Sequence, residues 1–205
     1  MLYMNRWIFI SCLVFISNLL LANKLKPSFK DGDRLPAMVF TDVFGKTMET
    51  DSLKGKKILL TFNRYVSCPL CNYHTHQILD YYDSLKKAGV IFISFYESSP
   101  KNLLQYVSQE EIPFIMVSDT DHAFYHQFGI GTSTAKTIRG LFHSFHKKHK
   151  IGKAAYKANY QKDGNTNQLT ADFLIDENGI IRTAYYAKFV GDHIPIEKII
   201  QWALE

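Results

Sequence analysis

The chain alternates short apolar runs with segments in which apolar residues recur at helical spacing. Three unbroken apolar runs predict buried strands, and a helical pattern follows each of them. The first run is residues 58–62 within the segment 56–63, the others are residues 90–96 and 114–117, and the helical patterns extend to residues 89, 107 and 128. Strands that alternate with helices predict βαβ units, so this part of the chain indicates an α/β fold with a mostly parallel sheet.

Patterns at the two ends of this region are of the antiparallel kind. Residues 35–50 predict two short extended segments joined by a turn, followed by a short turn of helix. Residues 171–176 and 180–186 flank a strong turn signal, Glu177-Asn178-Gly179, and predict a hairpin. Residues 194–204 predict a closing helix, for which Asp192 is the expected N-cap.

Residues 132–168 interrupt this rhythm. They hold eight Lys or Arg against one acid, Asp163, and show no strand pattern. A single amphipathic helix is predicted over residues 137–150, where three histidines and three lysines form a basic face. The apolar content is too small for a separate core, so the segment is interpreted as a helical basic insertion. Its basic face is either solvated or in contact with an anionic membrane surface.

Residues 1–22 differ from the rest, because Arg6 is their only charge and an apolar run extends from Ile8 to Ala22. This is typical of a signal peptide or of an N-terminal membrane anchor. Leu20 lies three residues before the cleavage point that Ala22 would mark and is poor for cleavage, so both alternatives stay open. Residues 23–32 are interpreted as a linker and residues 33–205 as the domain. An exported protein, periplasmic or anchored and facing outside the cytoplasm, is therefore predicted.

Charge and composition limit the possible partners. Without residues 1–22 the net charge is 23 − 19 = +4, because the leader removes one of 24 basic residues and none of 19 acids. Such a mild charge does not indicate nucleic-acid binding. Hydrophobic residues make up 46% of the chain, which is enough for a sizeable core.

Two of the three cysteines lie together after the first buried run. Cys68 and Cys71 form a C-x-x-C motif at the junction of a predicted strand and helix, whereas Cys12 belongs to the leader. A helix N-terminus favours thiolate, which is the nucleophile in thiol–disulfide and peroxide chemistry. A disulfide between residues so close constrains only a very small loop, so a redox pair is favoured over a structural disulfide.

Several motifs resemble the peroxiredoxin-like family of alkyl hydroperoxide reductases and thiol-specific antioxidants, within the thioredoxin-fold superfamily. The resemblance covers about residues 33–204 and is carried by residues 64–71, 112–119, 128–130, 171–179 and 191–193. It implies an α/β thioredoxin-like fold in which helices flank a central mixed sheet. It also implies that Cys68, which precedes Pro69, is the peroxidatic cysteine; Cys71 is then the resolving thiol.

Neighbouring residues depart from the pattern that the resemblance implies. A proline and a threonine that precede the family's cysteine correspond to Thr61 and Tyr65, and the family's later arginine aligns with Thr170. Tyr65 and Thr170 are the predicted substrate-binding residues. Arg64 is predicted to supply the positive charge beside Cys68 and so to join the catalytic group.

Other polar residues receive mainly structural predictions. His74 and His76 are expected to be exposed on the helix after the cysteines, with a proton-transfer role for His74 as the alternative. Asp119 and Asp121 are expected to cap the following helix. His193 has no assigned partner. Neither a metal site nor a cofactor is predicted.

The sequence thus predicts an exported thiol oxidoreductase that acts on a peroxide or on a protein disulfide. An external thiol reductant, such as a thioredoxin-like protein, would reset the Cys68–Cys71 pair. The alternative from another class is a non-catalytic thioredoxin-fold binding module with a static disulfide.

Overall fold

The computed structural model describes residues 26 and 28–205, apart from residues 109–111, 144 and 156–161. The predicted leader, residues 1–22, lies outside the described residues, and the division at residues 22 and 32 stays a prediction. Among the helices described, none has the length and apolar character needed to cross a membrane.

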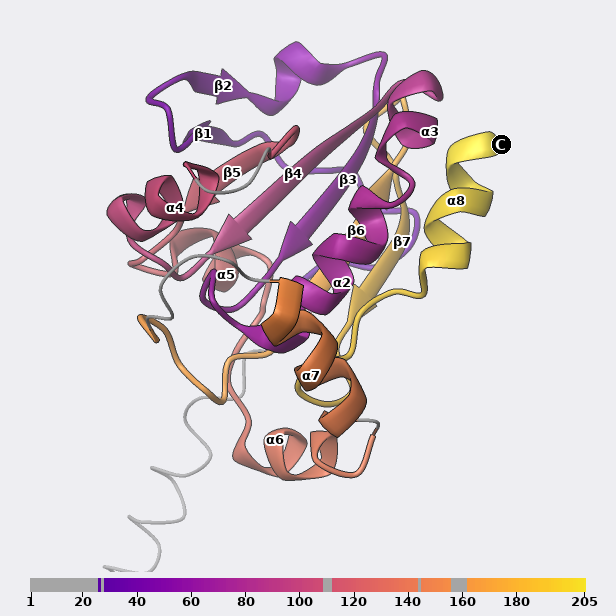
Figure 1. The fold of residues 1–205 in the computed structure, drawn as a ribbon. Helices are drawn as coiled ribbons and strands as arrows, with labels where there is room; N and C mark the ends of the chain where they lie inside the picture. Colours follow the sequence, from indigo (N-terminus) through magenta and orange to yellow (C-terminus); the bar gives the residue numbers. More distant parts are fainter. Residues whose placement is uncertain (1–25, 27, 109–111, 144, 156–161) are drawn as a thin grey trace, which may run out of the picture.

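A five-stranded sheet, in the order β5-β4-β3-β6-β7, forms the centre of the described part of the chain (Figure 1). It consists of β3 (Lys57–Phe62), β4 (Val90–Tyr96), β5 (Ile115–Ser118), β6 (Ala171–Ile175) and β7 (Ile181–Tyr186). The strands β3, β4 and β5 are parallel, while β6 and β7 pair in antiparallel register. The sheet is therefore mixed, as the family resemblance implied, because the predicted hairpin at Gly179 adds two antiparallel strands to the parallel βαβ part.

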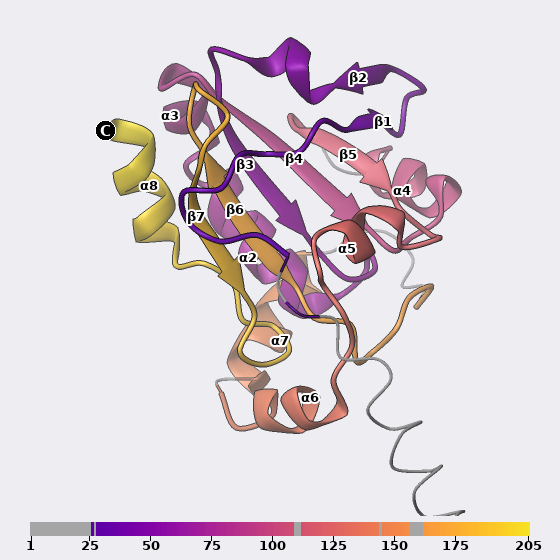
Figure 2. The same cartoon turned by 180° about the vertical axis from the view of Figure 1, so that it is seen from behind.

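Side chains of β3 alternate between two apolar layers, as the period of a strand requires. Leu59 packs on one face with residues of α2 (Pro69–Leu79), α3 (Tyr82–Lys87), α4 (Pro100–Val107) and α8 (Ile196–Leu204). Leu60 and Phe62 pack on the other face. Seen from behind, that face is covered by α5 (Ala123–Gln127) and by the segment that leads into β1 (Val39–Thr41) (Figure 2). The predicted α/β thioredoxin-like class, with helices on both faces, is confirmed.

At the N-terminal end of the domain, β1 pairs antiparallel with β2 (Thr47–Glu49), and the 3-10 helix η1 (Thr50–Leu53) follows. This is the predicted pair of extended segments with its helical turn. Asp42 stabilises the connecting turn, since its carboxylate accepts the amides of Phe44 and Lys46.

Two predicted helices are each divided. The helix after the cysteines ends with α2, and α3 begins at Tyr82, because the amide of Tyr81 bonds the carbonyl of Ile78 three residues back. The single helix predicted over residues 137–150 is wrong. The segment instead forms α6 (Thr134–Gly140) and α7 (Phe145–Ala155). Gly140 lies close to the backbone of Val190, where a Cβ atom would meet the Val190 carbonyl oxygen at 2.7 Å.

The two ends of the basic insertion pair with each other, and its helix α7 lies against α2. An isolated bridge pairs Thr132 with Gln168, the two residues that bound the predicted insertion. In Figure 1, α7 lies beside the first turns of α2. Contact is close at Gly152, because a Cβ atom there would come within 1.8 Å of the Pro69 carbonyl oxygen. The insertion therefore packs against the helix that carries the two cysteines.

Candidate active site

Cys68 lies where the central strand β3 gives way to α2. It is the N-cap residue of this helix, with Pro69 in the first helical turn. Proline suits this position because its fixed φ is that of a helix and its missing N–H would have no partner there. Both Cys68 and Cys71 are unpaired thiols and are buried, with Cys68 0% exposed. The structure therefore represents the dithiol form.

The environment of Cys68 favours its thiolate. Burial alone would raise the pKa of this thiol, but a hydrogen bond from Cys71, the charge of Arg64 and the first amides of α2 together lower it to about 5. The Arg64 guanidinium donates from Nη1 to the Cys68 sulfur at 3.4 Å. Cys68 is accordingly ionised near neutral pH.

Cys71 is tuned in the opposite direction. Burial and the neighbouring Cys68 raise the pKa of the Cys71 thiol well above its usual value. The backbone amide of Arg64 contacts the Cys71 sulfur at 3.5 Å. Because one thiol is ionised and the other retains its proton, the pair consists of a nucleophile and a proton-bearing partner, which is the division that sequential thiol chemistry needs.

Arg64 is held by contacts on several sides. Its Nη2 donates to the Thr166 carbonyl oxygen at 2.7 Å, and its guanidinium carbon lies 5.2 Å from the centre of the Tyr65 ring. Burial would lower the pKa of Arg64, but the facing Cys68 raises it, so the guanidinium stays charged. The predicted proximity of Arg64 to Cys68 agrees with this geometry, while its catalytic role stays a prediction.

The end of the insertion forms one wall of the site, a feature that sequence reasoning missed. Glu97, at the end of β4, accepts a hydrogen bond from the Asn165 amide and lies 2.9 Å from His122. Burial raises the pKa of the Glu97 carboxyl group. Gly164 lies so close that a Cβ atom would be 2.7 Å from Glu97 Oε2 and 2.9 Å from Tyr65 Cβ.

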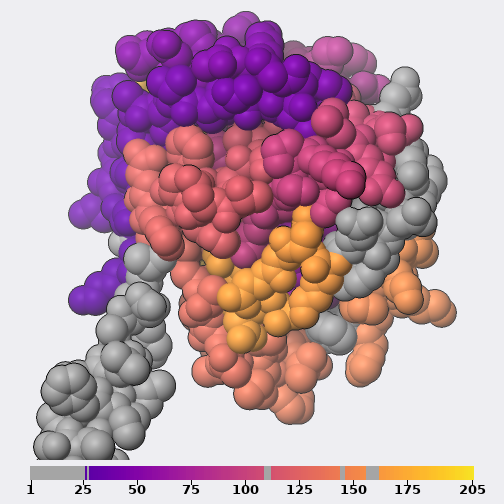
Figure 3. All heavy atoms as spheres, turned by 90° about the vertical axis from the view of Figure 1, so that its left-hand side faces the viewer, coloured from indigo at the N-terminus to yellow at the C-terminus, as the bar shows by residue number. Residues whose placement is uncertain are grey.

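Asp163 connects the end of the insertion to α4 and to the residues just before it by hydrogen bonds. Its carboxylate accepts hydrogen bonds from Ser98 Oγ at 2.7 Å and from Asn102 Nδ2 at 2.5 Å. Figure 3 shows the segment around residues 162–168, in orange, lying across the surface between α4 and α6. Asp163 is the only acid in residues 132–168, and this isolated position could have indicated that its carboxylate makes a structural contact.

The two predicted substrate-binding residues occupy different surroundings. Tyr65 is 4% exposed and packs in a small cluster with Cys68, Cys71 and Val190. Thr170 is also buried, but its hydroxyl donates to the Asp192 carbonyl oxygen at 2.7 Å. The structure thus brings Tyr65 to the cysteines and gives Thr170 a structural hydrogen bond. Substrate binding by either residue stays a prediction.

The structure corrects the expectation that His74 is exposed. His74 is 4% exposed, its ring stacks on His193 with centroids 4.2 Å apart, and its Nε2 lies 3.9 Å from the Asp172 carboxylate. Burial lowers the pKa of His74 to about 3. Helical spacing alone did not show this, because the face of α2 that carries His74 is covered by residues far along the chain.

The expected helix caps have mixed outcomes. Capping of α5 is confirmed, since Asp119 accepts the amides of Phe124 and Tyr125, and Asp121 accepts that of Ala123. Capping of α8 by Asp192 is wrong.

Pro195 precedes α8 directly, and Asp192 is occupied within its own turn. Its carboxylate accepts hydrogen bonds from the Lys188 amide and the Tyr185 hydroxyl.

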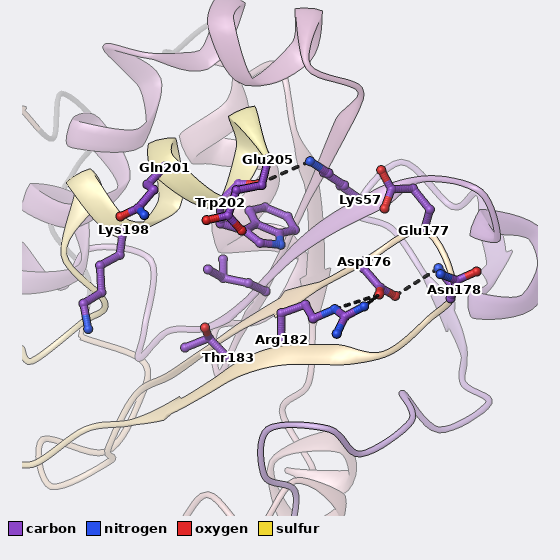
Figure 4. Close-up of a pocket in the computed structure, with 11 residues that line it drawn as sticks. Lys57, Asp176, Glu177, Asn178, Arg182, Thr183, Lys198, Gln201, Trp202 and Glu205 are labelled. Atoms are coloured by element: carbon purple, nitrogen blue, oxygen red, sulfur yellow. Dashed lines mark hydrogen bonds and ion pairs between the residues drawn. The ribbon is translucent and has the colours of Figure 1, made fainter.

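A cavity of about 610 Å³ lies at the opposite end of the sheet (Figure 4). Lys57, the first residue of β3, lines it together with Trp202 and the ion pair between Arg182 and Asp176. Cys68 lies in the chain beyond Phe62, the last residue of β3, and the six residues of this strand span roughly 20 Å. This cavity is therefore too far from the thiols to bind a molecule that reacts with them.

Fold and site together define a thioredoxin-like protein with a paired, ionised cysteine at the start of its first long helix. The AhpC/TSA family model matches residues 32–184, about three quarters of the chain. The chain belongs to the AhpC/TSA family.

Named relatives agree with this assignment. A putative peroxiredoxin from Coxiella burnetii is 26% identical over 167 residues, which cover 82% of this chain and 95% of that protein. Peroxiredoxin Bcp of Escherichia coli is 30% identical over 101 residues, covering 49% of this chain and 65% of the relative. The family supports a thiol-dependent oxidoreductase.

Solved structures share the fold at low identity. Peroxidoxin BcpB from Mycobacterium tuberculosis superposes with a TM-score of 0.62 at 13% identity, covering 86% of this chain and 97% of that one. A putative thiol:disulfide interchange protein DsbE from Chlorobium tepidum gives a TM-score of 0.58 at 16% identity, with the same coverages.

Proposed function

We propose that this protein is a thiol peroxidase in which Cys68 attacks the peroxide and Cys71 resolves the product. The observation that carries the proposal is the buried Cys68 thiol with a pKa of about 5, held 3.4 Å from the Arg64 guanidinium. A thiolate is the reactive form toward peroxides, and a positive charge beside it also stabilises the negative oxygen that leaves.

The reaction proceeds in three balanced steps. The Cys68 thiolate attacks one peroxide oxygen; the O–O bond breaks, Cys68 becomes a sulfenic acid, and the other oxygen leaves as an alkoxide or hydroxide that takes up a proton. Cys71 then attacks the sulfenic sulfur, and a disulfide and water form. An external dithiol, of the thioredoxin-like kind, reduces the disulfide and is itself oxidised.

Access to the buried thiolate depends on the insertion. Cys68 is 0% exposed, with α7 packed on the first turn of α2 and the Thr166 carbonyl on Arg64. A peroxide reaches the sulfur when this cover shifts. Oxidation also requires that Cys71 approach Cys68, and the hydrogen bond between the two thiols supports such an approach.

The same proposal places the reaction outside the cytoplasm. The apolar run between Ile8 and Ala22 supports export, either by a cleaved signal peptide or by an uncleaved anchor. An exported enzyme would need a reductant on the same side of the membrane. Mass spectrometry of the N-terminus, on protein isolated from a membrane fraction and from a soluble fraction, distinguishes the two fates of residues 1–22.

Stopped-flow oxidation by hydrogen peroxide tests the chemistry. The wild-type protein is expected to react faster than a free thiol of the same pKa and to form the Cys68–Cys71 disulfide. Cys71→Ser should stop at the sulfenic acid, which a dimedone-type probe labels, and Cys68→Ser should not react. A wild-type oxidation rate no higher than that of a free thiol refutes the proposed peroxidase function.

Exchange with protein disulfides is a second candidate function, and it is favoured by Tyr65. A tyrosine stands where the family resemblance implies a threonine that orients the peroxide, and it is buried beside Cys68. A low thiol pKa also serves disulfide exchange, because such a thiol is a good leaving group. Mixed-disulfide trapping by Cys71→Ser with a disulfide-bonded protein, compared with its peroxide rate, decides between the two reactions.

The non-catalytic alternative predicts a static disulfide. A reduction potential below about −300 mV would favour it, because disulfides of such potential resist physiological thiols. Failure of both the peroxide and the exchange assay, together with such a potential, would replace the enzyme by a binding module.

A further inference from the structure

A second buried cluster lies on the α8 side of the sheet and uses neither cysteine. Asp172 of β6 points to the same face as Leu174, where α2 and α8 pack. His74 comes from α2 and His193 from the turn before α8. One ligand-type atom from each of the three residues lies within 4.8 Å of the other two, and all three side chains are buried.

The distances are close to those of a metal site. His193 Nδ1 lies 3.1 Å from Asp172 Oδ2, and His74 Nε2 lies 3.9 Å from Asp172 Oδ1. Ligand atoms in a tetrahedral zinc site with bonds of about 2.1 Å are about 3.4 Å apart. Both separations from the carboxylate are within about half an ångström of this value, and the atoms of the three residues lie within 4.8 Å of one another, so coordination requires a local movement of the rings.

Unused hydrogen-bonding capacity also marks this cluster. Nε2 of His74, the atom that lies 3.9 Å from Asp172 Oδ1, is buried without a hydrogen-bond partner. Buried polar atoms are rarely left in this state, and an unfilled ion site is one physical reason for it. Among the described residues, the ion-pair partners of Asp172 are the two histidines, so its buried carboxylate faces no lysine or arginine.

We propose that His74, Asp172 and His193 bind a divalent transition-metal ion, for which Zn²⁺ is the probe. Two imidazoles and one carboxylate suit Zn²⁺, Fe²⁺ or Co²⁺ better than Mg²⁺ or Ca²⁺, which prefer oxygen ligands alone. The cation takes the place of the proton shared by His193 and Asp172, and the neutral His193 ring then carries its proton on Nε2. The Ile194 amide, which donates to Asp172 Oδ2 at 2.8 Å, holds the carboxylate in place.

Space for a fourth ligand exists beside the cluster. His74 and His193 line a cavity of about 290 Å³ that is also bounded by Tyr73, Gln77 and Lys148. A water molecule or a small ligand fits there, which gives the open coordination position of a reactive rather than a closed structural site. The two rings now stack with 14° between their planes, so binding requires one ring to turn until both nitrogens point at the ion.

Zinc binding is measured best in a Cys68→Ser/Cys71→Ser background, because thiolates would bind Zn²⁺ themselves. Calorimetric titration of this protein with Zn²⁺ is expected to give one ion per chain. His74→Ala, Asp172→Asn and His193→Ala should each weaken the affinity at least about 100-fold, more than loss of an outer-shell contact does. His126→Ala is the matched control, since His126 is exposed on α5 and should leave the affinity unchanged.

The insertion offers a competing site, because His143, His146 and His149 are spaced by three residues. Loss of binding in His146→Ala, with normal binding in His74→Ala, overturns the proposal. So does a failure of the Cys68→Ser/Cys71→Ser protein to bind Zn²⁺.

Histidine NMR avoids any folding defect in the variants. In the Cys68→Ser/Cys71→Ser protein with its histidines intact, Zn²⁺ should shift the ring-nitrogen signals of two mutually contacting histidines, His74 and His193. Unshifted signals for that pair at saturating Zn²⁺ refute the site.

Discussion

Removal of the Arg64 charge tests the electrostatics of the candidate site most directly. The guanidinium lies 3.4 Å from the Cys68 sulfur, and unit charges at that distance attract by about 5 kcal/mol at an effective dielectric constant of about 20. That corresponds to an upper limit of roughly 3.6 pKa units. Water that enters the vacated space will recover part of this energy, so Arg64→Ala should raise the Cys68 pKa by about 2 units, to about 7.

The choice of pH decides how visible this change is. At about pH 7 a thiol of pKa 5 is about 99% ionised and one of pKa 7 about 50%, so alkylation slows only about twofold. At about pH 5.5 the ionised fractions are about 76% and 3%, a difference of about 25-fold. Iodoacetamide alkylation of Cys68, followed by mass spectrometry across this range, should therefore give a profile displaced to higher pH.

Arg182→Ala is the matched control. Arg182 pairs with Asp176 at the other end of the sheet, so its loss removes an arginine charge without touching the thiols. Its alkylation profile should coincide with that of the wild-type protein. If Arg64→Ala moves the Cys68 profile by less than about half a pH unit, the hydrogen bond from Cys71 and the helix amides set this pKa, and the assigned role of Arg64 is incorrect.

Three further predictions follow from the same geometry. At pH 7, ionisation of Cys68 stabilises the dithiol form by about 2.7 kcal/mol with a pKa of 5 but by only about 0.4 kcal/mol with a pKa of 7, so Arg64→Ala should make the reduction potential about 50 mV more negative in a glutathione titration. Ionisation of Cys68 also stabilises the folded protein relative to the unfolded chain, because the folded pKa of Cys68 lies below its unfolded value. This contribution to folding stability is present at high pH and is lost as the pH falls through about 5. Reduced wild-type protein should therefore gain about 2 kcal/mol relative to Cys68→Ser between about pH 5 and 7 in urea unfolding. Gly152→Ala should displace α7 from α2, cost roughly 1–3 kcal/mol despite the better helix propensity of alanine, and speed Cys68 alkylation.

One control variant and two refuting outcomes accompany these predictions. Lys153→Ala changes the exposed neighbour of Gly152 and should leave both stability and alkylation unchanged. Equal reduction potentials for the wild-type protein and Arg64→Ala would show that the Arg64 charge does not influence the redox equilibrium of the cysteine pair. A pH profile of unfolding that is the same with and without Cys68 would show that the thiol is not ionised in the folded protein.

Local patterns identified most elements of the fold. The apolar run in β3, the turn at Gly179 and the position of Cys68 before α2 all depend on neighbours within a few residues. Such signals failed where a distant contact sets the outcome. The helix predicted over residues 137–150 is divided near Gly140, which docks against the backbone of Val190.

The sequence by itself determined the paired cysteines, their place at a strand–helix junction and the family to which the chain belongs. Only the tertiary structure decided what surrounds them. The Thr166 carbonyl meets Arg64 across 102 positions of sequence, and His74 meets Asp172 and His193 from two other elements. Hydrophobic spacing records which face of a helix is buried, but it does not record which residue packs against that face. The order of strands in the sheet and the path of the insertion determine which residues pack against that face.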